Sequence, residues 1–174
     1  TQLRGTVERF VARVASQPTD GDATELGRAG EVVAVVAAKG GVGVTTVAVN
    51  LAVEIARQGR TVALVDADVQ FGDVAICMAL RPQGTLLSAV QEGPRLNTRR
   101  LRSMMTRHEP SGVMVLPGAE DPVAADLIRP AEVANVIEIA SRIAEVVVVD
   151  VPAGLDDLAL AILDTSDRIA LVTT

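Results

Sequence analysis

The sequence predicts an α/β fold in which a mostly parallel, twisted sheet is flanked by helices. Continuous apolar runs at residues 32–38, 61–65 and 146–149 are typical of strands buried on both faces. Segments with helical periodicity follow at 45–57 and 131–144, so strands and helices alternate along the chain. With 174 residues, 49% of them hydrophobic, the chain has the material for one domain with a substantial core.

The other elements of this domain are shorter. Strands are expected at 113–116 and 168–173. Helical segments are expected within 70–92, at 95–107 and at 155–163.

The two ends of the chain differ from the predicted sheet domain, which we place at residues 31–174. Residues 1–16 carry apolar side chains at helical spacing, and residues 17–30 are rich in Gly, Asp, Thr and Pro. We therefore expect residues 1–30 to be a helix and a linker, with the helix either the tail of an upstream domain or docked on the sheet domain. We also expect the domain to be C-terminally truncated, because a doubly wound sheet normally covers a strand such as 168–173 with another helix.

Composition narrows the possible functions. The net charge is −6 and the chain has only two aromatic residues, so nucleic acid is not an expected partner. A single cysteine permits no internal disulfide and no all-cysteine metal site, which favours the cytoplasm. No apolar run is long enough to span a membrane.

Basic residues are unevenly distributed. Five arginines fall between residues 95 and 107, namely Arg95, Arg99, Arg100, Arg102 and Arg107. If this segment is one helix, positions 95, 99 and 102 share a face. Such a run is either an ordinary solvated surface or a binding surface for an acidic partner or a phosphate backbone.

The strongest motif is a glycine-rich turn between the first predicted strand and the following helix. It consists of Lys39, Gly40, Gly41, Val42, Gly43, Val44, Thr45 and Thr46. Glycines let successive backbone N–H groups converge on a phosphate, and the helix N-terminus adds its positive dipole end. Thr45 is placed to offer its hydroxyl to Mg²⁺. The alternative is a strand–turn–helix corner that uses glycine for geometry alone.

Val44 occupies the position where a phosphate loop ordinarily has lysine. That lysine bridges the β- and γ-phosphates and neutralises charge in the transition state, neither of which valine does. The chain's only lysine, Lys39, stands instead at the head of the loop.

Three aspartates follow predicted strands. Asp66 and Asp68 come at the end of the second strand, and Asp150 ends the run of four valines at 146–149. Because the carboxyl ends of parallel strands face the ligand crevice, these carboxylates are candidates for holding Mg²⁺ or its waters. The alternative is that they cap helices or solubilise loops.

These residues resemble the deviant Walker A family of P-loop ATPases, the group that contains MinD and ParA. The family pattern is KGGxGK[TS], and residues 39–46 read KGGVGVTT. Within the family, DADVQFGDV at 66–74 and SGVMVLPG at 111–118 look like the CpaE/TadZ branch of pilus-assembly proteins, whose loops often lack the second lysine. A related branch is septum-site-determining. The resemblance also implies that the helix and linker at 1–30 come from an upstream, receiver-like domain, which is common in these proteins.

The resemblance implies that the chain binds ATP or ADP with Mg²⁺ and forms a homodimer through the nucleotide. Lys39 would reach into the partner's nucleotide, and Asp68 would activate water. Thr45, Asp66 and Asp150 would lie on the magnesium side. Val44 departs from the pattern, which makes hydrolysis weak or absent.

Three functions follow from this resemblance. The first is a nucleotide-dependent localisation or scaffold factor for a bacterial cell-envelope machine, namely type IV (tight-adherence) pilus assembly. The second is a MinD-like ATPase that regulates septum placement or cell division. The third is a degenerate domain that binds no nucleotide. Under the first two, the partners are pilus, secretion or division proteins, and membrane or polar recruitment occurs through partners or a missing C-terminus.

Overall fold

The computed structural model describes residues 29–70, 72–118 and 128–173, so almost all of the expected helix and linker at 1–30 lies outside it. Within these ranges the elements in chain order are β1 (Glu31–Val36), α2 (Val44–Arg57), β2 (Val62–Asp66), α3 (Val74–Cys77), α4 (Leu86–Gln91), the 3₁₀ helix η1 (Gly93–Arg95), α5 (Thr98–Met104), β3 (Thr106–Arg107), β4 (Met114–Leu116), α7 (Pro130–Ser141), β5 (Val146–Asp150), α8 (Asp157–Thr165) and β6 (Arg168–Leu171).

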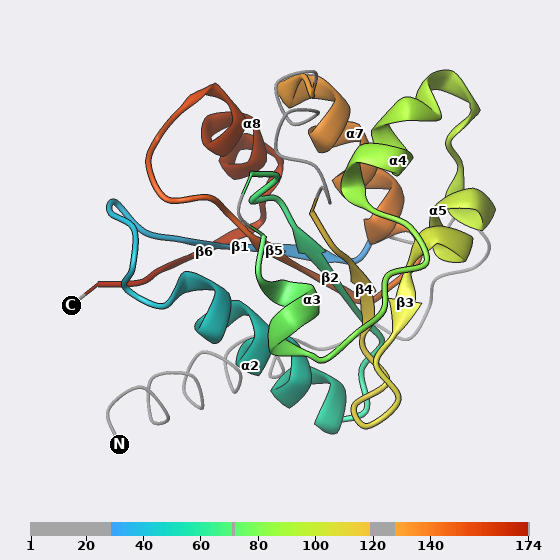
Figure 1. Cartoon of the computed structure of the whole chain (residues 1–174), viewed down its shortest axis with the longest axis horizontal. Helices are drawn as coiled ribbons and strands as arrows, with labels where there is room; N and C mark the ends of the chain where they lie inside the picture. Colours follow the sequence, from blue (N-terminus) through green and yellow to red (C-terminus); the bar gives the residue numbers. More distant parts are fainter. Residues whose placement is uncertain (1–28, 71, 119–127, 174) are drawn as a thin grey trace.

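A twisted six-stranded sheet runs through the described part of the chain in the order β3-β4-β2-β5-β1-β6 (Figure 1). Four of its five pairings are parallel, and only the short β3 runs antiparallel, to β4. The predicted fold class is therefore confirmed. Strand β5 lies between β1 and β2. The carboxyl ends of strands that are far apart in the sequence therefore lie side by side.

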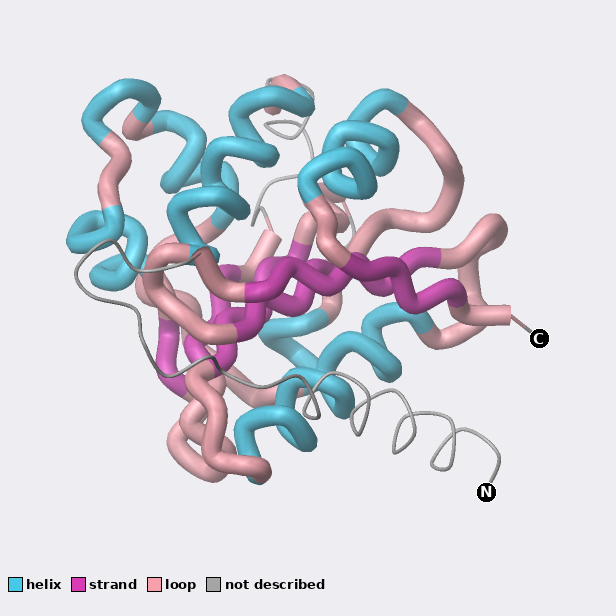
Figure 2. Tube along the Cα trace, turned by 180° about the vertical axis from the view of Figure 1, so that it is seen from behind, coloured by secondary structure: helices cyan, strands magenta, loops and turns pink. Residues whose placement is uncertain are grey.

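Helices cover both faces of the sheet, as Figures 1 and 2 show from opposite sides. Alternate residues of each strand point to opposite faces. In β1, Val33 and Val35 pack with α2 and α3, whereas Val32, Ala34 and Val36 pack in the cluster that holds α4, α5, α7 and α8. This two-sided burial explains why the strands are continuous apolar runs instead of alternating ones.

The segment 95–107 departs from the predicted single helix. Gly93–Arg95 form a 3₁₀ turn, Leu96 is extended with ψ 131°, and the α-helix begins only at Thr98, where the Asn97 side chain caps it. The same segment ends in the antiparallel strand β3. Arg95 therefore lies outside the helix that carries Arg99 and Arg102, and the expectation that the three share one helical face is wrong.

Polar groups connect the strands at their amino ends, on the side of the sheet opposite the carboxyl ends. The Glu145 carboxylate accepts hydrogen bonds from the backbone N–H and the hydroxyl of Thr61, at 2.7 and 2.9 Å. The Glu31 carboxylate pairs with both Arg60 and Arg168. These contacts connect β1, β2, β5 and β6 at their starts. None of the helices in the described ranges is both long and apolar enough to cross a lipid bilayer.

The packing of α2 generates a stability prediction. Leu51 is 1% exposed beneath the sheet, so Leu51→Ala should leave a cavity and lower the free energy of unfolding by about 3 kcal/mol, measured by urea denaturation. Leu160→Ala is the matched control, because Leu160 is also helical but is 48% exposed, and its effect should stay within about 0.5 kcal/mol. Equal losses in the two variants would contradict this assignment of the core.

Candidate functional site

The glycine-rich loop lies between β1 and α2, as predicted. It needs glycine at two positions, because Gly41 and Gly43 have φ values of +76° and +94°. These left-handed conformations are costly for residues with a Cβ atom. Gly43 is the N-cap of α2, so the loop turns directly into the helix at Val44.

The start of α2 is open to an anion. Gly43 offers no side-chain cap and the first turn contains no acidic residue. The amide of Val47 bonds to the Gly43 carbonyl at 3.0 Å, which leaves the earlier amides of the first turn, at Val44, Thr45 and Thr46, without intrahelical acceptors. Amides of this kind, together with the helix dipole, favour a phosphate oxygen.

The loop that follows β5 packs against the glycine-rich loop. The Gly154 amide donates to the Ala37 carbonyl at 3.3 Å, and the Cβ of Ala153 would lie 3.8 Å from a Cβ placed on Gly40. A ligand held by one loop therefore lies beside the other.

Two buried carboxyl groups meet beside this loop. Asp66 ends β2 and Asp150 ends β5, and the register of these neighbouring strands places the two residues directly opposite each other. They are 0% and 2% exposed. The hydroxyl of Thr45 lies beside the Asp150 carboxylate, which brings the start of α2 next to the acid pair.

Burial makes both carboxyl groups weaker acids. It raises the pKa of Asp66 to about 7, and repulsion from Asp150 adds to the effect. Burial likewise raises the pKa of Asp150 to about 6, with further contributions from the negative charges of Asp68 and Asp73, against the lowering effect of the Thr45 hydroxyl. A cation at this position would relieve both the desolvation and the repulsion.

The donor set fits a divalent cation held together with a phosphate. Asp150 Oδ2 is buried and has no hydrogen-bond partner. An orphaned buried acceptor beside a second carboxylate and a hydroxyl is a suitable environment for Mg²⁺ or one of its waters. Among the residues that the structure describes, no group of three or more His, Cys, Asp and Glu side chains is arranged to hold a metal by itself. Mg²⁺ commonly uses one or two carboxylates and completes its coordination with phosphate oxygens and water.

Asp68 lies next to this pair on a tightly enclosed turn. Its amide donates to Asp66 Oδ1 at 3.1 Å, and its side chain is half-buried. Its carbonyl oxygen would be only 2.6 Å from a Cβ on Gly72 and 2.7 Å from one on Gly118. The sequence did not predict that these two glycines, which lie 46 positions apart, enclose the Asp68 carbonyl. The Pro117-Gly118 pair after β4 was the one sequence feature that indicated a tight turn there.

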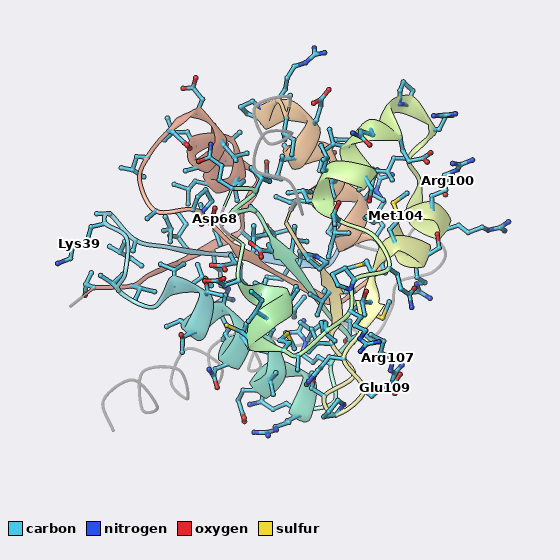
Figure 3. All side chains as sticks on the ribbon, in the orientation of Figure 1. Lys39, Asp68, Arg100, Met104, Arg107 and Glu109 are labelled. Carbon is cyan, nitrogen blue, oxygen red and sulfur yellow. The ribbon has the colours of Figure 1, made fainter. Side chains whose placement is uncertain are left out.

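Lys39 is not part of this cluster. It is exposed, and Figure 3 shows its side chain pointing into solvent at the end of the loop, away from Asp68. The structure thus brings together Thr45, Asp66 and Asp150, with Asp68 adjacent, and leaves Lys39 outside.

Val44 brings no charge to the loop. Its side chain packs against the apolar cluster formed by α2, α3 and one face of the sheet. The position that ordinarily supplies a phosphate-binding lysine therefore contributes to the core instead.

Known proteins are similar to this chain in sequence and fold. A family model described as an AAA domain matches residues 30–174. The antiactivator FleN of Pseudomonas aeruginosa is 33% identical over 145 residues, which cover 82% of this chain and 50% of FleN. The cell division ATPase MinD of Pyrococcus furiosus is 29% identical with a TM-score of 0.72, over 83% of this chain and 59% of that one.

A second solved structure includes a nucleotide. The septum site-determining protein MinD of Pyrococcus horikoshii OT3, complexed with Mg-ADP, is 25% identical with a TM-score of 0.71, over 82% of this chain and 57% of that one. The chain spans about half the length of the curated relatives it matches.

The acid pair generates a pH prediction. Between about pH 4 and pH 7 the folded state retains carboxyl protons that the unfolded state has released, so in metal-free buffer the free energy of unfolding should fall as pH rises. Asp150→Asn removes one charge and the repulsion it causes. We expect this variant to show a shallower decline and to be about 2 kcal/mol more stable than wild type at pH 8.

The measurement is urea denaturation across this pH range in the presence of EDTA. Asp164→Asn, at an exposed position of α8, is the control and should follow wild type. A wild-type stability that rises between pH 5 and pH 8 would refute the assignment of raised pKa values.

Proposed function

Because the chain belongs to the AAA domain family of MinD/ParA-type P-loop ATPases, we propose that it binds ATP with Mg²⁺ and uses the bound nucleotide to control the position of a cell-envelope machine. The observation that carries the proposal is the uncapped start of α2 beside an acid pair with an orphaned oxygen. Phosphate and Mg²⁺ would satisfy both features in one ligand.

In this proposal the backbone amides of residues 40–46 hold the phosphates of ATP or ADP. Thr45, Asp66 and Asp150 hold Mg²⁺ or its waters, and the ion neutralises phosphate charge when bound. Asp68 orients and activates the attacking water. The Mg-ADP complex of the Pyrococcus horikoshii relative supports a nucleotide and Mg²⁺ as the bound groups.

Val44 makes nucleotide hydrolysis slow or absent. The loop keeps its amides and its helix terminus, so binding survives, but a charged contact to the transferring phosphate is missing. Losing one such contact typically raises the barrier by several kcal/mol. The chain therefore acts as a localisation or scaffold factor whose partner binding follows nucleotide occupancy, in a homodimer linked by Lys39.

We assign the machine to type IV (tight-adherence) pilus assembly, because DADVQFGDV at 66–74 and the altered loop at 39–46 resemble that branch of the family. The protein would be cytoplasmic and recruited to the inner face of the membrane or to the pole by its partners. The second candidate is a MinD-like ATPase that regulates septum placement, favoured by the similarity to MinD proteins.

Restoring the lysine tests the role of Val44. Isothermal titration calorimetry with ATP and Mg²⁺ should show binding to wild type, and phosphate release should be far below that of an ordinary P-loop ATPase. Val44→Lys should tighten binding, raise turnover or both, by about tenfold or more, because it returns a charge to the phosphates.

Asn50→Lys adds the same charge on the exposed side of α2 and is the control; it should change neither quantity. Absence of any binding heat in wild type would overturn the proposed function. Unchanged binding and turnover in Val44→Lys would show that valine is not what limits this site.

Lys39 is expected to link nucleotide occupancy to dimerisation. Its exposed position, directed away from its own acid pair, suits a contact to a second subunit's nucleotide. Sedimentation velocity with ATP and Mg²⁺ should show dimers for wild type and mostly monomers for Lys39→Ala. Lys39→Arg should rescue poorly, because a planar fork replaces a compact ammonium. Arg57→Ala, at an exposed site in α2, is the control; Lys39 variants that dimerise like wild type would defeat the idea.

A further inference from the structure

A basic surface lies at the β3 end of the sheet and is not used by the proposed nucleotide site. Residues 93–108, which form η1, α5 and β3, contain five of the chain's 16 basic residues and none of its 22 acidic ones. We call this segment the arginine surface. It stands out because the whole chain has a net charge of −6.

Part of the arginine surface is held in place by neighbouring groups. Arg100 pairs with Glu92, and Arg102 donates through Nη2 to the carbonyl of Ile143 at 3.3 Å. Arg99 and Arg107 are exposed and make no ion pair with any residue that the structure describes. Arg100 and Arg102 are thus held by neighbouring groups, whereas the charges of Arg99 and Arg107 are available to an incoming anion.

This surface is remote from the nucleotide loop. Figure 3 shows Arg100 and Arg107 at one end of the molecule and Lys39 at the other, with the sheet between them. A partner bound at the arginine surface would therefore leave the loop and its exposed lysine accessible.

The side chains around the arginine surface indicate whether a membrane, DNA or a protein segment would bind there. The exposed large apolar side chains of the described residues are Ile76, Leu155, Leu160, Ile169 and Leu171, and none of them lies in the arginine surface. A membrane-binding patch normally adds apolar side chains that insert between lipids. A long polyanion such as DNA would also meet the acidic remainder of the protein. A short acidic peptide segment can contact Arg99 and Arg107 without reaching most of the acidic remainder, although Glu92 and Glu109 flank the arginine surface, and the planar forks of the arginines match carboxylates.

We propose that the arginine surface binds an acidic segment of a partner protein, with Arg99 and Arg107 as its main contacts. This binding does not depend on the proposed nucleotide site, so either proposal can fail without the other. It gives a localisation factor a surface for a second protein that stays available when nucleotide is bound.

The test uses a fluorescein-labelled decapeptide of glutamate, titrated with the protein at low salt and followed by fluorescence anisotropy. Charge reversal in the double variant Arg99→Glu/Arg107→Glu should weaken binding about fivefold or more. Arg57→Glu is the matched control, because Arg57 is exposed on the opposite face of the sheet, and it should bind like wild type. Circular dichroism of each variant establishes that the fold is intact.

Two further probes decide between partners. Vesicles with 30% phosphatidylglycerol and a DNA duplex should bind more weakly than the peptide, and the double variant should not change their binding more than Arg57→Glu does. Stronger vesicle or duplex binding that the double variant abolishes would overturn the proposal in favour of that ligand. An equal effect of the double variant and Arg57→Glu on peptide binding would also overturn it, since the attraction would then be unspecific.

Discussion

The parallel pairing of β2 with β5 is the constraint on which the candidate site depends. Its register places Asp66 directly opposite Asp150, and both carboxyl groups are buried at the carboxyl edge of the sheet. Two like charges in such a position destabilise the protein unless protons or a cation compensate them. The sheet that stabilises the fold therefore creates a local electrostatic cost that a cation would remove.

The surrounding loops are built around this pair. The Thr45 hydroxyl at the start of α2 lies beside the Asp150 carboxylate. The amides of Asp68 and Val74 donate to the Asp66 carboxylate at 3.1 and 3.3 Å. The backbone at Gly72 and Gly118 comes so close to the Asp68 carbonyl that a side chain at either position would clash with it. The turn at Asp68 therefore lies against both the acid pair and the residues that follow β4. The amide of Leu86 donates to the Pro117 carbonyl at 2.7 Å, which extends these contacts to the start of α4.

Binding and catalysis place different demands on this site. Backbone amides and a helix terminus attract phosphate whatever the loop side chains are, whereas transition-state stabilisation needs positioned charge. Val44 packs against the core cluster and brings no charge to the loop, so the loop meets the first requirement through its backbone. In the function proposed above, a bound but slowly hydrolysed nucleotide would suit a protein that marks a location and recruits partners, and the arginine surface would offer one place for such a partner.

Much of the molecule could be predicted from local sequence patterns. Apolar runs indicated the buried strands, and the glycines before Thr45 indicated the strand–loop–helix unit, because both signals arise within a few neighbouring residues. The aspartates at strand ends were also recognised in advance, since parallel topology brings such ends together.

Only the tertiary structure decided which groups touch. The meeting of Asp66 with Asp150 depends on strand order, and the enclosure of the Asp68 carbonyl depends on Gly118, which local periodicity does not connect to it. The break in the 95–107 segment likewise arises because Leu96 is extended and buried and because β3 pairs with β4. Helical periodicity in the sequence is a local property, whereas strand pairing and burial depend on residues far along the chain; the sequence therefore determined the elements, and the packed structure determined their contacts.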